Sequence, residues 1–271
     1  MKNRATWSDA HNHLHDARLG DPAPVIAEMR DAGVSRSVVN ATCEADWPQV
    51  EALALAHPDF VLPAFGIHPW KAHTVTDGWE NRLRELLERH PHASLGECGL
   101  DRWIDSPGLN VQTPAFDAHL RLARELDRPL IIHCLKAWQA LFDAFDREAP
   151  PKHFLLHSFN GSIETARRLL PLGAYFSFSG YFLHDRKASV VETFRQLPPD
   201  RVLLETDAPD MLPPAGQIRW PLPDNANHPA NLPAIAEAYA ERTGCDLKAL
   251  SERNEENFVR FFRTQRQNPN D

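Results

Sequence analysis

Two histidines early in the chain have the spacing of metal ligands. His11 and His13 lie two residues apart, after Asp9, in the segment SDAHNHLHD. Residues two apart on a β-strand point to the same side, so both imidazoles can reach one ion through a ring nitrogen. Because short motifs often match by chance, two unrelated polar residues at a strand edge are the alternative interpretation.

Five further residues of metal-ligand type repeat one placement, each after a short apolar run. They are His68 in GIHP, Glu97 in GECGLD, His133 in LIIHC, His157 in FLLHS and Asp207 in LLETD. Any one of them alone would be an ordinary solvated loop residue. Together they place ligand-type side chains at the same end of several strands, which is where barrel enzymes keep their active sites.

The elements that must position these residues are short apolar runs alternating with longer amphipathic stretches. Runs that are apolar on both faces are typical of buried parallel strands. The strand candidates are Thr6–Ala10, Ser37–Ala41, Val61–Gly66, Ala93–Gly96, Pro129–Ile132, His153–Leu156, Ala174–Phe178 and Val202–Leu204. The helical patterns are Pro24–Asp31, Glu80–Arg89, Pro114–Leu126, Ala137–Phe145, Ile163–Leu170, Ala188–Leu197, Leu232–Thr243 and Leu247–Phe262. This alternation predicts a single-domain α/β protein, a (β/α)8 TIM barrel, with an open doubly wound sheet as the alternative.

The rest of the chain fits one undivided barrel. Its 271 residues and 42% hydrophobic content suit a single large core. The proline-rich stretch Pro209–Pro233 predicts a loop over one barrel end. We expect the hydrolase barrel to occupy residues 1–264 and a polar tail, 265–271, to fray.

Charge and composition limit the kind of partner. The net charge is −8 at pH 7 and the pI about 5.9, which argues against a protein that coats long duplex DNA with a broad basic surface. A nuclease acting on an end or a short strand is not excluded, since bound divalent cations add local positive charge. The sequence has no CxxC pair, no signal-peptide core and no apolar run of membrane-span length. We therefore expect a cytoplasmic protein with no membrane partner, and the sequence indicates no obligate protein partner.

The motifs also occur in a particular order. HNHLHD at His11–Asp16 is followed by GIHP, GECGLD, IIHC, HSFNGS, LLETDAP, NHPANLP and ENFVRFF. This series spans nearly the whole chain and resembles the TatD family of metal-dependent deoxyribonucleases, within the amidohydrolase-like TIM-barrel hydrolases. The resemblance implies two divalent ions, which would be zinc, magnesium or manganese.

By this resemblance, Glu97 would bridge the two ions. The other ligands would be His11, His13 and Asp207 for the first ion, and His133 and His157 for the second. His68 would lie over the site and touch the substrate or a transition-state oxygen. Asp207 is placed to orient the attacking water and accept its proton, so the expected catalytic residues are Asp207, Glu97 and His68.

Departures from the family pattern concern substrate recognition. The family often has an arginine after the strand-five histidine, where this chain reads His133-Cys134-Leu135-Lys136. Lys136 is a substitute that lacks the bidentate fork of arginine. The family's NEP reads Asn227-His228-Pro229 here. Because bases stack on aromatic rings and phosphates pair with cations, we expect substrate contacts from Lys136, Arg102, Trp70 and Trp103, with Phe159, Tyr181 and Arg186 as further rim candidates.

These observations predict a divalent-metal-dependent deoxyribonuclease. It would hydrolyse phosphodiester bonds with metal-activated water and trim single-stranded DNA ends, because a deep barrel mouth admits an end more readily than intact duplex. The alternative is an amide, ester or lactone hydrolase on the same site, since the fold does not choose between these chemistries. A non-catalytic metal-binding interaction subunit is a third interpretation, which open coordination positions disfavour.

Overall fold

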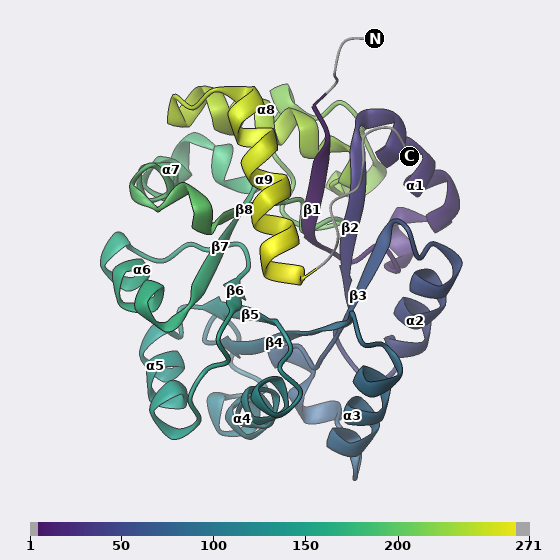
Figure 1. Cartoon of the computed structure of the whole chain (residues 1–271), viewed down its shortest axis with the longest axis vertical. Helices are drawn as coiled ribbons and strands as arrows, with labels where there is room; N and C mark the ends of the chain where they lie inside the picture. The colour runs from purple at the N-terminus through teal and green to yellow at the C-terminus, as the bar shows by residue number, and fades with distance from the viewer. Residues whose placement is uncertain (1–4, 264–271) are drawn as a thin grey trace. The chain divides into compact units, whose positions relative to one another are not determined.

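The computed structural model of the chain describes residues 5–263, so the predicted tail at 265–271 lies outside the described residues. One sheet contains eight strands, which are neighbours in chain order (Figure 1). They are β1 (Trp7–Asn12), β2 (Val34–Asn40), β3 (Val61–Phe65), β4 (Ser94–Asp101), β5 (Leu130–Leu135), β6 (Phe154–Leu156), β7 (Ala174–Ser179) and β8 (Val202–Glu205). The strands are parallel, as in the pairs β4–β5 and β5–β6. The consecutive order confirms the (β/α)8 barrel and excludes the doubly wound sheet, whose strand order reverses.

Each strand is followed by at least one α-helix. The helices are α1 (Pro22–Ala32), α2 (Trp47–Ala56), α3 (Trp79–Arg89), α4 (Leu109–Glu125), α5 (Trp138–Arg147), α6 (Ile163–Leu169), α7 (Ala188–Gln196), α8 (Leu232–Thr243) and α9 (Leu247–Phe262). None of these described helices is long and apolar enough to cross a membrane.

The helix α2 was not predicted. Its sequence WPQVEALALA buries Trp47, Val50 and Ala54 but leaves Leu55 68% exposed. Apolar side chains therefore lie on both faces, and the helical periodicity that would reveal the element is weak. Trp47 anchors the helix, because its Nε1 donates a hydrogen bond of 2.9 Å to the carbonyl of Gly66.

Two strands extend beyond their apolar runs. β4 continues through the GECGLD motif to Asp101, and β5 continues to Leu135. Glu97 and His133 therefore lie inside their strands, and the prediction that they end them was wrong. Glycine and polar residues interrupt the apolar pattern there, while the backbone pairing persists from Cys98 to Asp101.

The same stretch of β4 requires two glycines. Gly96 and Gly99 have φ values of +135° and +142°. A Cβ on Gly99 would lie 1.9 Å from the His133 carbonyl oxygen, and one on Gly96 would lie 2.7 Å from that of Ile131. Only glycine fits this close backbone approach, which sets Glu97 beside His133.

The described residues form two compact units. Unit 1 comprises the chain up to Val39, residues 59–61 and the chain from Ser177 onwards, and unit 2 comprises Asn40–Pro58 and Leu62–Phe176. In unit 1, α9 packs against β1 and β8, with its phenylalanines buried (Figure 1). In unit 2, the core lies between β4–β6 and the helices α4 and α5.

Candidate active site

Three ligand-type atoms form a triangle in unit 1, which we call the first cluster. His11 Nε2 and His13 Nε2 are 3.3 Å apart. Asp207 Oδ1 lies 3.4 Å from the His11 nitrogen and 3.5 Å from the His13 nitrogen. A tetrahedral zinc ion with bonds of about 2.0–2.1 Å separates its donor atoms by about 3.4 Å. The first cluster therefore has the spacing of three ligands on one divalent cation.

Backbone hydrogen bonds hold the first cluster together. His11 lies in β1 and His13 directly after it, while Asp207 follows β8 by two residues. The amide of Asp207 donates to the His11 carbonyl at 2.9 Å, and the amide of His13 donates to the Ala208 carbonyl at 2.8 Å. Asp207 has a φ of +52°, a left-handed conformation that aspartate tolerates better than most residues. This turn presents its carboxylate to both histidines.

Asp9 holds the backbone on which the first cluster is built. Its carboxylate accepts hydrogen bonds from the His11 amide at 3.2 Å, the Thr206 hydroxyl at 2.6 Å and the Asn12 amide side chain at 3.0 Å. Burial raises the pKa of Asp9 to about 7, although these hydrogen bonds lower it. Asn227 donates to the Thr206 carbonyl at 2.9 Å and fixes the same segment. The sequence placed Asp9 beside the histidines but gave no sign of these long-range bonds.

A second triangle lies in unit 2, and we call it the second cluster. Glu97 Oε1 lies 2.8 Å from His157 Nε2 and 3.2 Å from His133 Nδ1. The two histidine nitrogens are 3.2 Å apart. The Glu97 side chain is 2% exposed, and His157 directly follows β6. These separations again suit ligands of one divalent ion.

Asp101 orients His133 within the second cluster. Its Oδ2 accepts a hydrogen bond from His133 Nε2 at 2.9 Å, so the neutral imidazole keeps a lone pair on Nδ1, the atom that faces Glu97. Burial raises the pKa of Asp101, but hydrogen bonds from His133, the Trp103 amide and Trp70 outweigh burial and lower it. A carboxylate behind a ligating histidine is a common support in metal sites. Asp101 belongs to the GECGLD motif, but its position in the sequence did not predict this role.

The ring of His68 faces Glu97 through its Nε2 atom. Its Nδ1 accepts from the Trp70 amide at 3.1 Å, so in the neutral ring Nε2 carries the proton. That Nε2 lies 3.3 Å from Glu97 Oε1. The ligand atoms of His68, Glu97 and His133 also lie within 4.8 Å of one another, which makes a metal-ligand role geometrically open. The tautomer favours the predicted role, a contact to substrate.

The predicted substrate contacts in unit 2 lie at the surface. Trp70 is 45% and Trp103 63% exposed, and Lys136 Nζ lies 4.0 Å from the centre of the Trp103 ring. Trp70 Nε1 donates to Asp101 at 2.7 Å, which ties this aromatic side chain to the second cluster. Arg102 is exposed on the same loop. These residues offer aromatic faces and cations to a ligand.

The three further rim candidates differ in their surroundings: Phe159 is buried, whereas Tyr181 and Arg186 bond to each other. Phe159 is fully buried and packs on Phe176, with ring centres 4.6 Å apart, so the expectation that it lines a rim was wrong. In unit 1, Arg186 donates to the Tyr181 hydroxyl at 2.7 Å. The sequence could not distinguish Phe159 from a rim residue because it lies in a loop-like, polar stretch, SFNGS.

Comparison with known proteins shows which family the chain resembles. The family model described as TatD related DNase matches residues 8–263. The chain belongs to the TatD family. Among TatD relatives, the 3'-5' ssDNA/RNA exonuclease TatD of Pantoea ananatis is 31% identical over 244 residues, covering 89% of this chain and 93% of the relative. The protein of the same name from Edwardsiella piscicida is 33% identical over 250 residues, covering 90% and 94%.

A solved TatD structure agrees with the fold. The TatD homologue YJJV from Escherichia coli K12 superposes with a TM-score of 0.88 at 26% identity, covering 96% of this chain and 99% of that one. Membership in the TatD family confirms the resemblance drawn from the motif series. The role of each individual residue stays a prediction.

Proposed function

We propose that this chain is a divalent-metal-dependent exonuclease that removes nucleotides from single-stranded DNA ends. The observation that carries the proposal is the pair of clusters, each a triangle of imidazole and carboxylate atoms at metal-ligand spacing. The relatives named 3'-5' ssDNA/RNA exonuclease support the substrate class and the direction of digestion, and they widen it to RNA.

The two clusters correspond to two cations. Their residues come from β1 and the loop after β8, and from β4, β5 and the loop after β6. In a (β/α)8 barrel, the C-terminal ends of all strands line one face, where the active site lies. By the family resemblance, Glu97 would be the carboxylate that both ions share. The imidazoles of both clusters suit zinc, while their carboxylates and added water ligands would also accept magnesium or manganese.

When bound, the cations supply Lewis-acid chemistry, lowering the pKa of water and stabilising charge on phosphate oxygens. The chain's own residues supply the rest. Asp207 turns Oδ1 toward the histidines, and we assign its other oxygen to orient the attacking water and accept its proton. His68 offers its Nε2 proton to an oxygen that gains charge in the transition state.

The end of the nucleic-acid substrate is held by the surface residues of unit 2. Lys136 pairs with a phosphate, and the exposed rings of Trp103 and Trp70 stack on bases. The net charge of −8 opposes binding of long duplex and leaves recognition to this local patch.

The decisive experiment compares substrates on one preparation. Protein stripped and reloaded with zinc, manganese or magnesium is assayed on end-labelled single strands, duplexes, and chromogenic esters and phosphodiesters. We expect stepwise shortening of single strands from the 3' end. If the protein cleaves esters but no nucleic acid with any of the metals, it is a carbonyl hydrolase and this proposal is wrong. If it turns over none of the substrates, the non-catalytic metal-binding subunit is favoured.

A further inference from the structure

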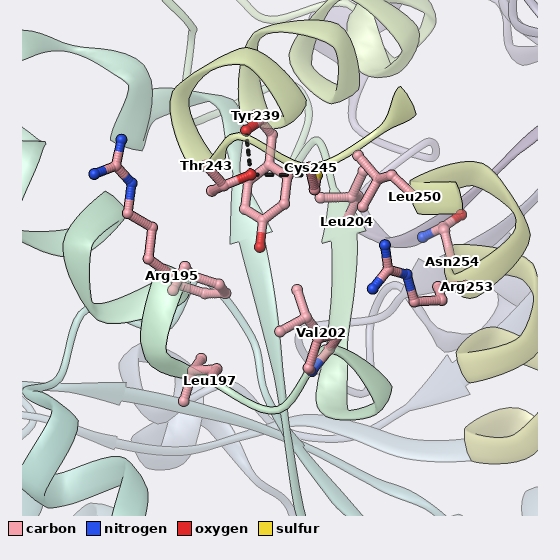
Figure 2. Close-up of a pocket in the computed structure, with 12 residues that line it drawn as sticks. Arg195, Leu197, Val202, Leu204, Tyr239, Thr243, Cys245, Leu250, Arg253 and Asn254 are labelled. Atoms are coloured by element: carbon pink, nitrogen blue, oxygen red, sulfur yellow. Dashed lines mark hydrogen bonds between the residues drawn. The ribbon is translucent and has the colours of Figure 1, made fainter. Parts of the chain in front are cut away.

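A cavity of about 110 Å³ lies in unit 1, and none of its lining residues belongs to either cluster (Figure 2). Its lining residues come from α7, α8, α9, the start of β8 and the short segments between them. Its apolar lining comprises Phe194, Leu197, Pro199, Val202, Leu204 and Leu250. Val202 opens β8, whereas Asp207 follows the other end of that strand, so the cavity belongs to the opposite end of the barrel strand from the first cluster.

One buried polar group in this lining lacks a partner. Asn254 is 2% exposed, and its Oδ1 accepts a hydrogen bond of 3.0 Å from the Ser8 amide. Its Nδ2 has no hydrogen-bond partner among residues 5–263. Figure 2 shows this nitrogen on the cavity side of the side chain. Because buried donors are nearly always satisfied, the free N–H indicates that an acceptor belongs in the cavity.

Arg253 adds a positive charge beside Asn254. Its Nε donates to the Ala249 carbonyl at 3.1 Å, and no carboxylate of the described chain pairs with the guanidinium. Figure 2 shows the guanidinium turned toward the cavity. Arg195 differs, since its guanidinium donates to the Arg242 carbonyl and points away, leaving only its stem in the lining.

Tyr239 contributes a third donor. Its side chain is 5% exposed, and its hydroxyl extends into the cavity in Figure 2. Burial raises the pKa of Tyr239, so the hydroxyl stays protonated. The polar wall thus presents three donor groups, one of them a cation. Thr243, whose hydroxyl donates to the Tyr239 carbonyl, Cys245 and the Arg195 stem also line the cavity, and the remaining lining side chains are apolar.

We propose that this cavity binds a short-chain monocarboxylate, with the carboxylate on Arg253 and Asn254 and the alkyl tail on the apolar wall. An arginine beside an amide donor suits a carboxylate through charge-assisted hydrogen bonds. A cavity of 150 Å³ holds benzene, so the smaller volume here admits about four to six non-hydrogen atoms. Propionate and butyrate have that size, whereas longer chains exceed it.

The test measures binding of acetate, propionate, butyrate and hexanoate by calorimetry, with butyramide as a neutral isostere. Metal-free protein in carboxylate-free buffer is used, so that no ligand can bind through a catalytic cation. We expect propionate or butyrate to bind with a Kd of about 1 mM or tighter, and butyramide and hexanoate at least about 10-fold more weakly.

Two variants and one control locate the site. Arg253→Met keeps the apolar stem and should weaken butyrate binding about 10-fold or more, because the charge-assisted bond is lost. Asn254→Asp keeps the acceptor for Ser8 but turns an anionic oxygen toward the ligand, and it should weaken binding at least as much. Arg195→Met is the matched control and should bind like the wild type.

Three results would overturn the proposal. They are no saturable binding of any carboxylate, equal affinity for butyramide, and an unchanged Kd in Arg253→Met. If a variant fails to fold, the methyl resonances of Val202, Leu204 and Leu250 in the wild-type protein decide instead. Butyrate must shift these methyl signals saturably, and shifts confined to other residues place the ligand elsewhere.

Discussion

Asp101 joins three groups at the edge of the second cluster. Its carboxylate accepts hydrogen bonds from His133 Nε2, Trp70 Nε1 and the Trp103 amide. It therefore couples the tautomer of a predicted metal ligand to the position of two exposed aromatic residues. Metal affinity and substrate binding should both depend on this one side chain.

Replacing Asp101 tests that dependence. Asp101→Ala should lower metal affinity by about 10–100-fold, the usual effect of losing a carboxylate behind a ligating histidine. Competition with a chromogenic chelator measures the affinity, and Asp105→Ala, an exposed aspartate of the same loop, is the control. Wild-type metal affinity in Asp101→Ala would show that His133 is positioned without it.

Asp207 is the residue on which the proposed chemistry depends most. Asp207→Asn keeps the size of the side chain but removes the proton acceptor, so kcat on single-stranded DNA should fall by about 100-fold or more with KM little changed. Asp210→Asn, three residues later and paired with Arg18 at the surface, is the matched control. Near-wild-type kcat in Asp207→Asn, with metal content verified, would assign water activation to another group.

His119 gives the fold a defined acid sensitivity. Burial lowers the pKa of His119 from 6.5 to about 4, although a hydrogen bond to the Ala115 carbonyl raises it. Between these values the unfolded chain takes up a proton that the folded chain does not, so stability falls as the pH drops from 6.5 to 4. The loss from this group approaches about 3 kcal/mol.

Urea unfolding at pH 7 and pH 4.5 measures this loss. His119→Leu should be less stable at pH 7, because the Ile67 amide loses its acceptor. It should then lose less stability than the wild type on acidification. Parallel pH profiles for the two proteins would mean that His119 titrates normally in the folded state.

At the scale of elements, the bounds of strands with purely apolar sequences were easier to predict than the bounds of strands that carry functional residues. The ligand-type residues could be found because each follows an apolar run. The ends of β4 and β5 could not be predicted, because glycine and polar side chains replace the apolar pattern where these strands carry Glu97 and His133. The supports Asp9, Asp101 and Asn227 were missed because their hydrogen bonds join residues distant in sequence.

The glycines of β4 are predicted to be irreplaceable. Gly99→Ala should lower the free energy of unfolding by about 3 kcal/mol or more, since the added Cβ meets the His133 carbonyl and the φ is unfavourable. Gly216→Ala is the control, because nothing lies within 4 Å of a Cβ there and its φ is ordinary. Urea denaturation measures both, and equal stability of the two variants would contradict the close approach of β4 and β5.

At the scale of the whole molecule, the proposed cations should stabilise the fold. A ligand that binds only the native state at about 1,000 times its Kd adds about 4 kcal/mol, which corresponds to about 10 °C in Tm for a chain of this size. Chelation should lower the Tm of metal-loaded protein accordingly. The double variant His11→Ala/His133→Ala should be indifferent to chelator, and a wild-type Tm that ignores chelation would count against both clusters as metal sites.

The acidic net charge makes a further prediction about salt. With a net charge of −8 and few local cations, binding of a phosphorothioate single strand should depend weakly on monovalent salt, at about 0.7 logarithmic units per phosphate engaged. Lys136→Ala should raise KM, most at low salt, and reduce this slope by about 0.7, the share of one phosphate contact. A slope that is unchanged in the variant would remove Lys136 from the substrate site.

The division into two units also has a consequence for the order of events during synthesis. Most of unit 2 is one stretch, Leu62–Phe176, so the residues of the second cluster leave the ribosome close together. Unit 1 instead needs both early and late residues. Ser8 bonds to Asn254, and His13 must wait for Asp207, which lies 194 residues further along the chain. At about 5–20 residues per second, that wait lasts about 10–40 s. The first cluster can therefore take up its ion only after Asp207 has been synthesised, whereas the ligands of the second cluster are all present once His157 has been added.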